Sequence, residues 1–527
     1  MGRQSIYEYM AEQMQGDAMP EGFSLPAEAE GEAGGLRWAD GAADGVYIYH
    51  MQHSPLEAGE MQEAIEAVRL ASGYDVENAD RAFETFTAKH NTISFADQLL
   101  GWIMEHAAEL DAGSIYRYGI HLMIESPYRE MVKLGLILME LFDTNVEVLG
   151  DVVRSLGLSD EFTLYSVLNL QRWPNGSEEI FDLIRRVRGW GRIHALEHLE
   201  PETKEIQDWI LKEGMDNEVM EAYSALTAFQ KGAAEVRLRL GASPEELKSI
   251  GKILNVLLEE GPVEGISGLS NAEEILCLFL RQLKPEMLGL EECRLAQQLY
   301  YYTAGRLQAM EKNADNTTDR TPEEGNELPA ENGAEAEAVK NALAEASRLA
   351  VELLRAPETE KLVREALQEG RGVELAAALG IPYQKDLLRL MKDDFDKNSG
   401  LCAWLMESPA YAEAVLDLYR RNIDLETLGE NAENADKEEK SWMQLQQLLM
   451  AMGGDCRTAG DILLKTLGAP SEGCRYYTLE CLKAWTEKAG EPLQKLSARI
   501  YNKLEECAGR ETDAEMKETM QKLLGGN

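Results

Sequence analysis

The chain has 527 residues, of which 52 are Lys or Arg and 94 are Asp or Glu, so its formal net charge at pH 7 is −42. This charge excludes a general affinity for DNA, RNA or anionic membranes, because phosphate binding needs a cationic surface. We therefore expect no nucleic-acid partner and no membrane partner, and the charge favours basic proteins or peptides. Hydrophobic residues make up 44% of the chain, enough for extensive burial.

Targeting and membrane signals are missing from the sequence. The N-terminus lacks the cationic region and apolar stretch of a secretory signal peptide. Apolar runs such as residues 134–142 are much shorter than a membrane span. We therefore expect a cytoplasmic protein.

Residues 1–54 are predicted to form an irregular N-terminal segment rich in Gly, Ala and Glu. Within it, residues 36–39 and 46–50 contain aromatic and β-branched side chains on either side of two Asp-Gly pairs. Aromatic residues flanking such turn signals are typical of a β-hairpin. The sequence therefore predicts a small β-hairpin there, either a separate ribbon or a cap on the first helices.

The rest of the chain is predicted to be helical. Residues 55–310 form an almost continuous helical pattern broken by short Gly, Pro and Asn turns, which predicts a first helical repeat domain. Residues 311–333 are acidic and nearly devoid of large apolar side chains, so we expect a disordered linker. Residues 334–527 return to helical patterns and are predicted to form a second repeat domain. The expected fold class is all-α.

Residues 189–210 look like one repeat of two short helices. Pro201 stands where we expect the second helix to begin, a position that tolerates proline. The first helix has an apolar stripe at a spacing of three to four residues, formed by Trp190, Ile193, Leu196 and Leu199. The pattern Arg-x-x-x-Leu-Glu-x-Leu of residues 192–199 recurs at residues 475–482. One such unit cannot bury its apolar faces alone, so neighbouring units are expected to stack.

A His-x-x-Glu-His motif lies inside this repeat, at His194, Glu197 and His198. Two imidazoles one helical turn apart can face one metal ion, and the glutamate can act on a bound water, as in inverted zinc peptidases. The related unit at residues 475–482 keeps the glutamate but replaces both histidines. The glutamate is therefore interpreted as part of the repeat, and no metal site is predicted. A zinc-dependent hydrolase using His194 and His198 is kept as an alternative.

An arginine run precedes and overlaps the motif, with Arg185, Arg186, Arg188 and Arg192 around Trp190 in a strongly acidic chain. The guanidinium groups could grip a carboxylate or phosphate, with stacking on the indole. They could also form ion pairs with neighbouring repeats while Trp190 packs between helices. We take Arg185, Arg186, Arg188, Trp190, Arg192, His194 and His198 as the candidate binding residues, and we expect no catalytic residue among them.

Cofactor signatures are missing as well. The seven cysteines form no Cys-x-x-Cys pair, so zinc-ribbon and thioredoxin-like sites are not indicated. Cys474 and Cys481 are seven residues apart and are expected to pack on one helix face. The sequence contains no nucleotide-binding glycine loop and no nucleophile elbow. We therefore expect no cofactor.

Two resemblances add to these patterns. The Arg-x-x-x-Leu-Glu-x-Leu helix followed by a proline resembles short HEAT-type repeats of the armadillo-like group, most clearly over residues 96–232 and also at 470–508. This resemblance implies a solenoid of helical hairpins. Residues 156–162, 169–181 and 189–201 also resemble an uncharacterised bacterial family in which some members are named limonene hydroxylase. That name implies an oxygenase with haem, non-haem iron or flavin, and the residues present offer no ligand set for any of them.

Together these patterns predict a non-catalytic helical-repeat scaffold that binds a protein or peptide. A monooxygenase resembling limonene hydroxylase and a zinc-dependent hydrolase are the two alternatives.

Overall fold

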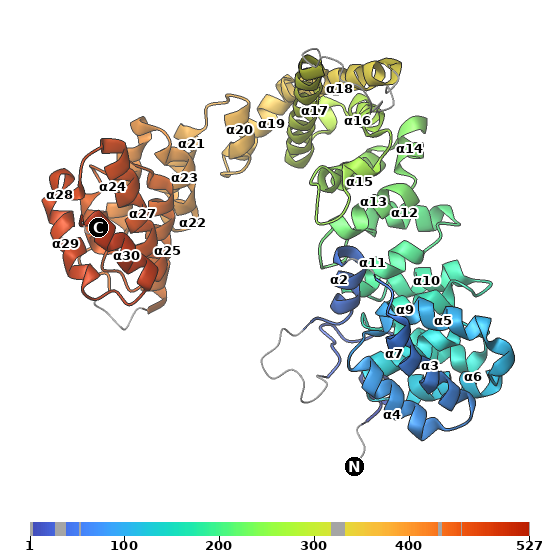
Figure 1. The fold of residues 1–527 in the computed structure, drawn as a ribbon. Coiled ribbons are helices and arrows are strands. Elements are labelled where there is room, and N and C mark those ends of the chain that lie inside the picture. Colours follow the sequence, from blue (N-terminus) through green and yellow to red (C-terminus); the bar gives the residue numbers. More distant parts are fainter. Residues whose placement is uncertain are drawn as a thin grey trace. The chain divides into compact units, whose positions relative to one another are not determined.

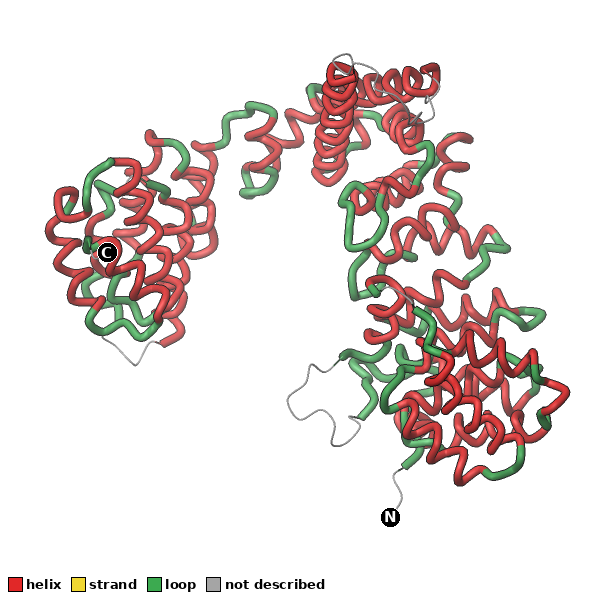
Figure 2. Tube along the Cα trace, in the orientation of Figure 1, coloured by secondary structure: helices red, strands yellow, loops and turns green. Residues whose placement is uncertain are grey.

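The computed structural model describes residues 4–26, 38–51, 54–317, 333–429, 435–454 and 456–525. All regular elements in these residues are helices, apart from one isolated bridge between Gln15 and Ala18 (Figures 1 and 2). The all-α fold class is therefore confirmed for the described part of the chain.

The chain divides into two compact units. The first contains Met1–Leu283 and Gln298–Leu349, and the second contains Lys284–Gln297 and Ala350–Asn527. Helices α17 (Leu290–Thr317) and α18 (Gly333–Leu354) each contribute to both. Residues 318–332, which hold most of the predicted linker, lie outside the described residues, and residues 311–317 continue α17. The domain boundaries expected from the sequence stay a prediction.

The other helices of the first unit begin and end as follows: α1 (Ile6–Gln13), α2 (Ala42–His50), α3 (Ala58–Ser72), α4 (Val76–Thr87), η1 (Thr92–Ser94), α5 (Ala96–Glu105), η2 (Ala107–Glu109), α6 (Ala112–Glu125), α7 (Arg129–Met139), α8 (Glu147–Gly157), α9 (Thr163–Leu170), α10 (Gly176–Ile184), α11 (Gly189–His198), α12 (Lys204–Glu213), α13 (Ala222–Lys231), α14 (Ala234–Leu240), α15 (Pro244–Leu257), η3 (Ile266–Gly268) and α16 (Ala272–Gln282).

Helices of the first unit pack on the following helix, most extensively α3 on α4, α6 on α7 and α8 on α9, and many also pack on the next helix but one. Helix α7 contacts α9, α9 contacts α11, α11 contacts α13 and α13 contacts α15, while α14 contacts α16. Such packing is consistent with a helical repeat, in which each hairpin buries its apolar face on the next. Every residue of α7 from Met131 to Met139 is buried, which explains the apolar run seen in the sequence.

In the second unit the helices are η4 (Pro285–Met287), α19 (Pro357–Leu367), α20 (Val373–Ala378), α21 (Gln384–Asp393), α22 (Phe395–Asn398), η5 (Ser399–Leu401), α23 (Cys402–Met406), α24 (Pro409–Asn422), α25 (Ala435–Met452), α26 (Gly460–Thr466), α27 (Glu472–Ala489), α28 (Leu493–Leu496), α29 (Ala498–Ala508) and α30 (Ala514–Leu523). Here α21 packs on α23, α23 on α25, α25 on α27 and α27 on α30.

Two cysteines of the second unit are buried in its hydrophobic core. Cys474 and Cys481 are buried free thiols on α27. Their sulfur atoms lie 3.1 Å from the carbonyl oxygens of Trp442 and Leu449 on α25. The prediction that they share one helix face and pack there is confirmed.

The predicted β-hairpin is wrong where the structure describes it, because residues 46–50 belong to helix α2. Tertiary contacts override the β-propensity of Val46, Tyr47, Ile48 and Tyr49. Asp44, in the first turn of α2, forms an ion pair with Lys133 of α7 at 2.8 Å. Gly45, the next residue, lies against the ring of Trp190 so closely that a Cβ would come within 2.2 Å of it.

The second helix of the 189–210 repeat begins later than expected. Helix α12 starts at Lys204, and Thr203 caps it by accepting a hydrogen bond from the backbone N–H of Ile206 at 3.2 Å. A threonine hydroxyl satisfies one of the free N–H groups of the first turn, which a proline cannot do. Pro201 therefore lies in the loop before the cap.

We predict that Gly45→Ala destabilises the first unit by about 1 to 3 kcal/mol, because the added methyl overlaps the Trp190 ring and α2 must shift. Urea unfolding followed by circular dichroism measures the effect. The matched control is Gly101→Ala in α5, where a Cβ would have no neighbour within 4 Å. That substitution should instead stabilise by roughly 0.5 to 1 kcal/mol, since alanine favours helix over glycine. Wild-type stability of Gly45→Ala would contradict the close packing of α2.

Candidate functional site

A cleft of about 1250 Å³ opens beside the turn between α10 and α11. One wall is the N-terminal segment, residues 18–24 and 38–40, and the other walls come from three loops of the stack. These loops, between α8 and α9, α10 and α11, and α12 and α13, contribute Leu158, Asp160, residues 185–190, Glu218 and Val219. The three loops are alternate connections between consecutive helices, and all three line the same cleft.

Two arginines of the run hold the same carboxylate at this cleft. Arg185 Nη2 lies 2.5 Å from Asp182 Oδ1, and Arg186 Nη2 lies 2.6 Å from Asp182 Oδ2. Asp182 is one turn earlier on α10, so these pairs are local to the helix. Arg186 also approaches Asp17 of the N-terminal segment at 3.5 Å.

The other two arginines of the run separate. Arg188 lines the cleft and pairs with Glu218 of the next hairpin, with 3.2 Å between Nε and Oε1. Arg192 is buried, stacks over the ring of Trp209 and donates to the carbonyl of Glu213 at 3.0 Å. The structure therefore brings Arg185, Arg186 and Arg188 to one surface and places Arg192 inside.

Trp190 touches the cleft but is itself mostly buried. Its ring centroid lies 4.8 Å from that of Tyr223 on α13 and 6.0 Å from that of Tyr49 on α2. These contacts join three helices around the indole. Trp190 is thus a packing residue whose edge forms part of the cleft wall.

The two histidines of the motif take different partners. His194 is buried, its ring lies against the rings of both Tyr49 and Trp190, and its Nδ1 is 3.9 Å from Glu197. That separation is too long for a hydrogen bond, and among the described residues neither ring nitrogen of His194 has a hydrogen-bond partner. His198 Nδ1 instead lies 3.1 Å from the side-chain oxygen of Gln171.

The glutamate of the motif also differs from its counterpart in the related unit. Glu197 accepts a hydrogen bond from the hydroxyl of Tyr49, whereas Glu480 is exposed on α27. The two glutamates of the recurring pattern thus have different surroundings, because the contact of Glu197 depends on α2, and their interpretation as a shared repeat residue stays a prediction. Across the described ranges, no group of three or more His, Cys, Asp or Glu is arranged to hold a metal ion.

Asp160 is a cleft residue that sequence reasoning missed. Its carboxylate lies against the first turn of α11, where the backbone N–H groups of Arg188 and Gly191 favour its charged form. Gly189 is required there, since its φ is +52° and a Cβ would lie 2.1 Å from Asp160 Oδ2. Burial and the nearby Asp40 raise the pKa of Asp160 to about 7.

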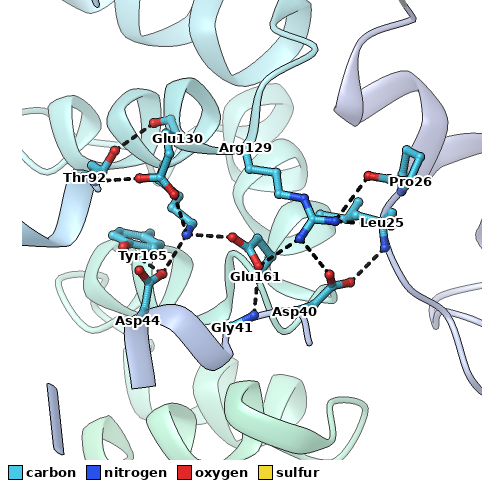
Figure 3. A network of polar contacts seen from close by, with 11 residues as sticks. Leu25, Pro26, Asp40, Gly41, Asp44, Thr92, Arg129, Glu130, Glu161 and Tyr165 are labelled. Atoms are coloured by element: carbon cyan, nitrogen blue, oxygen red, sulfur yellow. Dashed lines mark hydrogen bonds and ion pairs between the residues drawn. The ribbon is translucent and has the colours of Figure 1, made fainter. Parts of the chain in front are cut away.

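A buried lysine anchors the N-terminal wall of the cleft (Figure 3). The Nζ atom of Lys133 lies 2.8 Å from Asp44, 2.8 Å from Glu130 and 2.6 Å from Glu161, and the side chain is 1% exposed. Tyr165 donates to Asp44 at 3.0 Å. Burial alone would lower the pKa of Lys133, but the three carboxylates outweigh it and hold the pKa well above its usual value.

Arg129 extends the same network to the cleft rim (Figure 3). Its guanidinium donates to Asp40 at 2.9 Å and to the carbonyls of Leu25 and Pro26 at 3.2 Å. Asp40 in turn accepts from the N–H of Leu25 at 2.8 Å. Arg129, at the start of α7, thereby holds Leu25, Pro26 and Asp40 of the N-terminal segment.

The sequence offered one signal for this network and none for Asp160. Lys133 is a lone cation inside the apolar run of α7, and a charge in a buried helix must be paired. Its partners Asp44 and Glu161 lie on other elements, so the sequence did not identify them. Nothing in the local sequence distinguishes Asp160 from an ordinary loop aspartate.

We predict that Lys133→Met lowers the free energy of unfolding of the first unit by about 3 to 5 kcal/mol, because three buried carboxylates lose their counter-charge. The control is Lys89→Met, which removes an exposed ion pair with Glu63 and should change stability by less than about 1 kcal/mol. Adding Asp44→Asn to Lys133→Met should recover part of the loss. If Lys133→Met and Lys89→Met had equal stability in urea unfolding, the network would be contradicted.

We predict that Asp160→Asn weakens the pH dependence of stability. The pKa of Asp160 is about 7 in the folded chain against an ordinary 3.8, so between these values only the folded state keeps the proton. Stability therefore falls as pH rises through this window, by roughly 1 to 3 kcal/mol for a partly buried group. Asparagine keeps an acceptor oxygen but does not ionise. Unfolding in urea at about pH 4.5 and pH 8 compares the two proteins, and identical profiles would contradict the assignment.

Comparison with known proteins gives no family assignment. No model of a known protein family matches the chain, and the search of curated proteins returned no match. No helix in the described ranges is both long enough and apolar enough to cross a membrane.

Proposed function

We propose that this chain is a non-catalytic scaffold of HEAT-like helical hairpins that binds a protein or peptide in the cleft beside α10 and α11. The observation that carries the proposal is the cleft itself, where three alternate loops between the helices and the N-terminal segment surround about 1250 Å³. Small-molecule pockets usually occupy about 300 to 1000 Å³. An open groove of this larger size suits a stretch of polypeptide.

The repeat assignment has its own support. The equivalent leucines of the two related units, Leu196 with Leu479 and Leu199 with Leu482, are all buried. Arg192 and Arg475, which begin the pattern, have different acceptors, the carbonyl of Glu213 at the end of α12 and the carbonyl of Ala469 in the loop before α27. Burial of the leucines at equal positions favours a repeated structural unit of the HEAT-like type.

The same geometry favours binding over catalysis. His194 is packed against the rings of Tyr49 and Trp190, and His198 bonds to Gln171. The two imidazoles of the motif therefore do not share one open site. The cleft offers arginine side chains, the partly exposed Trp38 and backbone from several loops. These groups are typical of a surface that recognises a partner chain.

A photo-crosslinking amino acid placed at Val219 tests this proposal. Val219 lines the cleft and is 39% exposed, while Val236 on α14 is 54% exposed and does not line it. In the native cell, we expect a discrete crosslinked protein at Val219 and little at Val236, since the partner occupies the cleft. Equal adducts at both positions, or none at Val219, would contradict the proposal.

A further inference from the structure

A second cavity lies beside the cleft, and the two share part of their lining. It has a volume of about 460 Å³ and is lined by residues of α8, α9 and α10 together with Met14 and Asp17 of the N-terminal segment. Leu158 and Arg186 line both this cavity and the cleft. Because residues 18–24 line the cleft, residues 14–24, which we call the strap, separate the two cavities above a shared floor.

Both ends of the strap are anchored in the first unit. Before it, Ile6 and Met10 of α1 are buried, and the N–H of Ile6 donates to the carbonyl of Ser126 at 3.0 Å. After it, the buried Leu25 donates to Asp40 at 2.8 Å and accepts from Arg129 at 3.2 Å. The strap is therefore a segment with two fixed ends.

Between these anchors the strap has few contacts. Every residue from Met14 to Ser24 is at least partly exposed. Among the described residues, its only polar contacts outside the N-terminal segment are with Arg186, which donates to the carbonyl of Asp17 at 3.4 Å and lies 3.5 Å from its carboxylate. The Asp17 side chain is 83% exposed, and ion pairs this exposed contribute little to stability. A segment with so few buried contacts opens readily.

Two glycines let the strap change direction. Gly16 and Gly22 have φ values of +70° and +73°, and within the described residues no heavy atom lies within 4 Å of where a Cβ would stand. Glycine adopts positive and negative φ about equally readily, so the backbone can turn at both positions without a clash. The strap can therefore swing away from the floor while its two ends stay in place.

We propose that the strap is an autoinhibitory contact, which covers the floor at Leu158 and Arg186 in the free chain and is displaced when a partner binds. The occupant of this floor is thus a segment of the chain itself. Lifting the strap joins the two cavities, so the partner meets a longer groove along α8 to α11 than the cleft alone offers. This inference rests on the proposed function and adds its regulation.

The reactivity of a cysteine placed under the strap tests whether the strap opens. The reporter is Leu158→Cys in the full chain, combined with Cys507→Ser because Cys507 is the one native cysteine that is not buried. Labelling with N-ethylmaleimide is followed by intact-mass spectrometry. It should be about three- to tenfold faster when Met14→Ser and Asp17→Arg loosen the strap, the factor expected for an exposed ion pair and one partly buried side chain.

A second reporter and a control keep this measurement decisive. If Leu158→Cys lowers the melting temperature, Ser155→Cys replaces it, since Ser155 lines the second cavity and differs from cysteine by one atom. The control reporter is Leu269→Cys. Leu158 and Leu269 are both 8% exposed, but Leu269 lines neither cavity, so its labelling should not depend on the strap. Labelling at position 158 that ignores the loosened strap, or that accelerates equally at both positions, would overturn the inference.

The photo-crosslinking amino acid at Val219 tests the inhibition itself. With Met14→Ser and Asp17→Arg, the yield of the crosslinked partner in the native cell should rise about three- to tenfold, because the floor is uncovered more often. An adduct of equal yield with the wild-type and the loosened strap would overturn the inference but leave the proposed function. No adduct with either strap would overturn both.

Discussion

The cleft depends on a single buried charge. An isolated ammonium group inside a protein is strongly unfavourable, and Lys133 is tolerated because three carboxylates surround it. One of them, Asp44, belongs to α2, and another, Glu161, also accepts from the N–H of Gly41 at 2.8 Å. The pairing of Lys133 therefore requires the N-terminal segment to lie against α7 and α9. Once the segment is held there, it forms the wall opposite the arginine loops.

The first turn of α11 connects the ion pairs of Lys133 with the cleft. Trp190 packs under Gly45 of α2, while Gly189 and Gly191 leave room for the carboxylate of Asp160. Each contact needs a small residue at a defined place, since even a methyl group would overlap its neighbour. The residues that first suggested a metal centre, His194 and Glu197, are used in packing and bonding α2 through Tyr49. The most distinctive motif of the chain therefore serves to join α2 to α11.

The net charge of −42 acts on the approach of any charged molecule. The cleft itself carries both signs of charge, because Glu21, Asp40, Asp160 and Glu218 line it together with Arg185, Arg186 and Arg188. Each of these arginines forms an ion pair with a carboxylate of the chain. The arginine run therefore first serves to balance acidic side chains of the same surface.

The sequence by itself determined the helical class and much of the candidate surface. Periodic apolar residues reflect helix faces directly, so the helical patterns predicted within residues 55–310 and 334–527 correspond to the helices from α3 to α30. The run of Arg185, Arg186 and Arg188 was found because its members are adjacent in the chain. Only the tertiary structure decided the rest. Arg192 differs from its neighbours because helical rotation turns it inward, and residues 46–50 are helical because Asp44 and Gly45 meet α7 and Trp190. Asp44 and Glu161 both pair with Lys133, although they come from distant parts of the chain. Gly41, which lies just before α2, is separated from Glu161 by 120 positions and also bonds to it. No local pattern encodes a contact between segments so far apart.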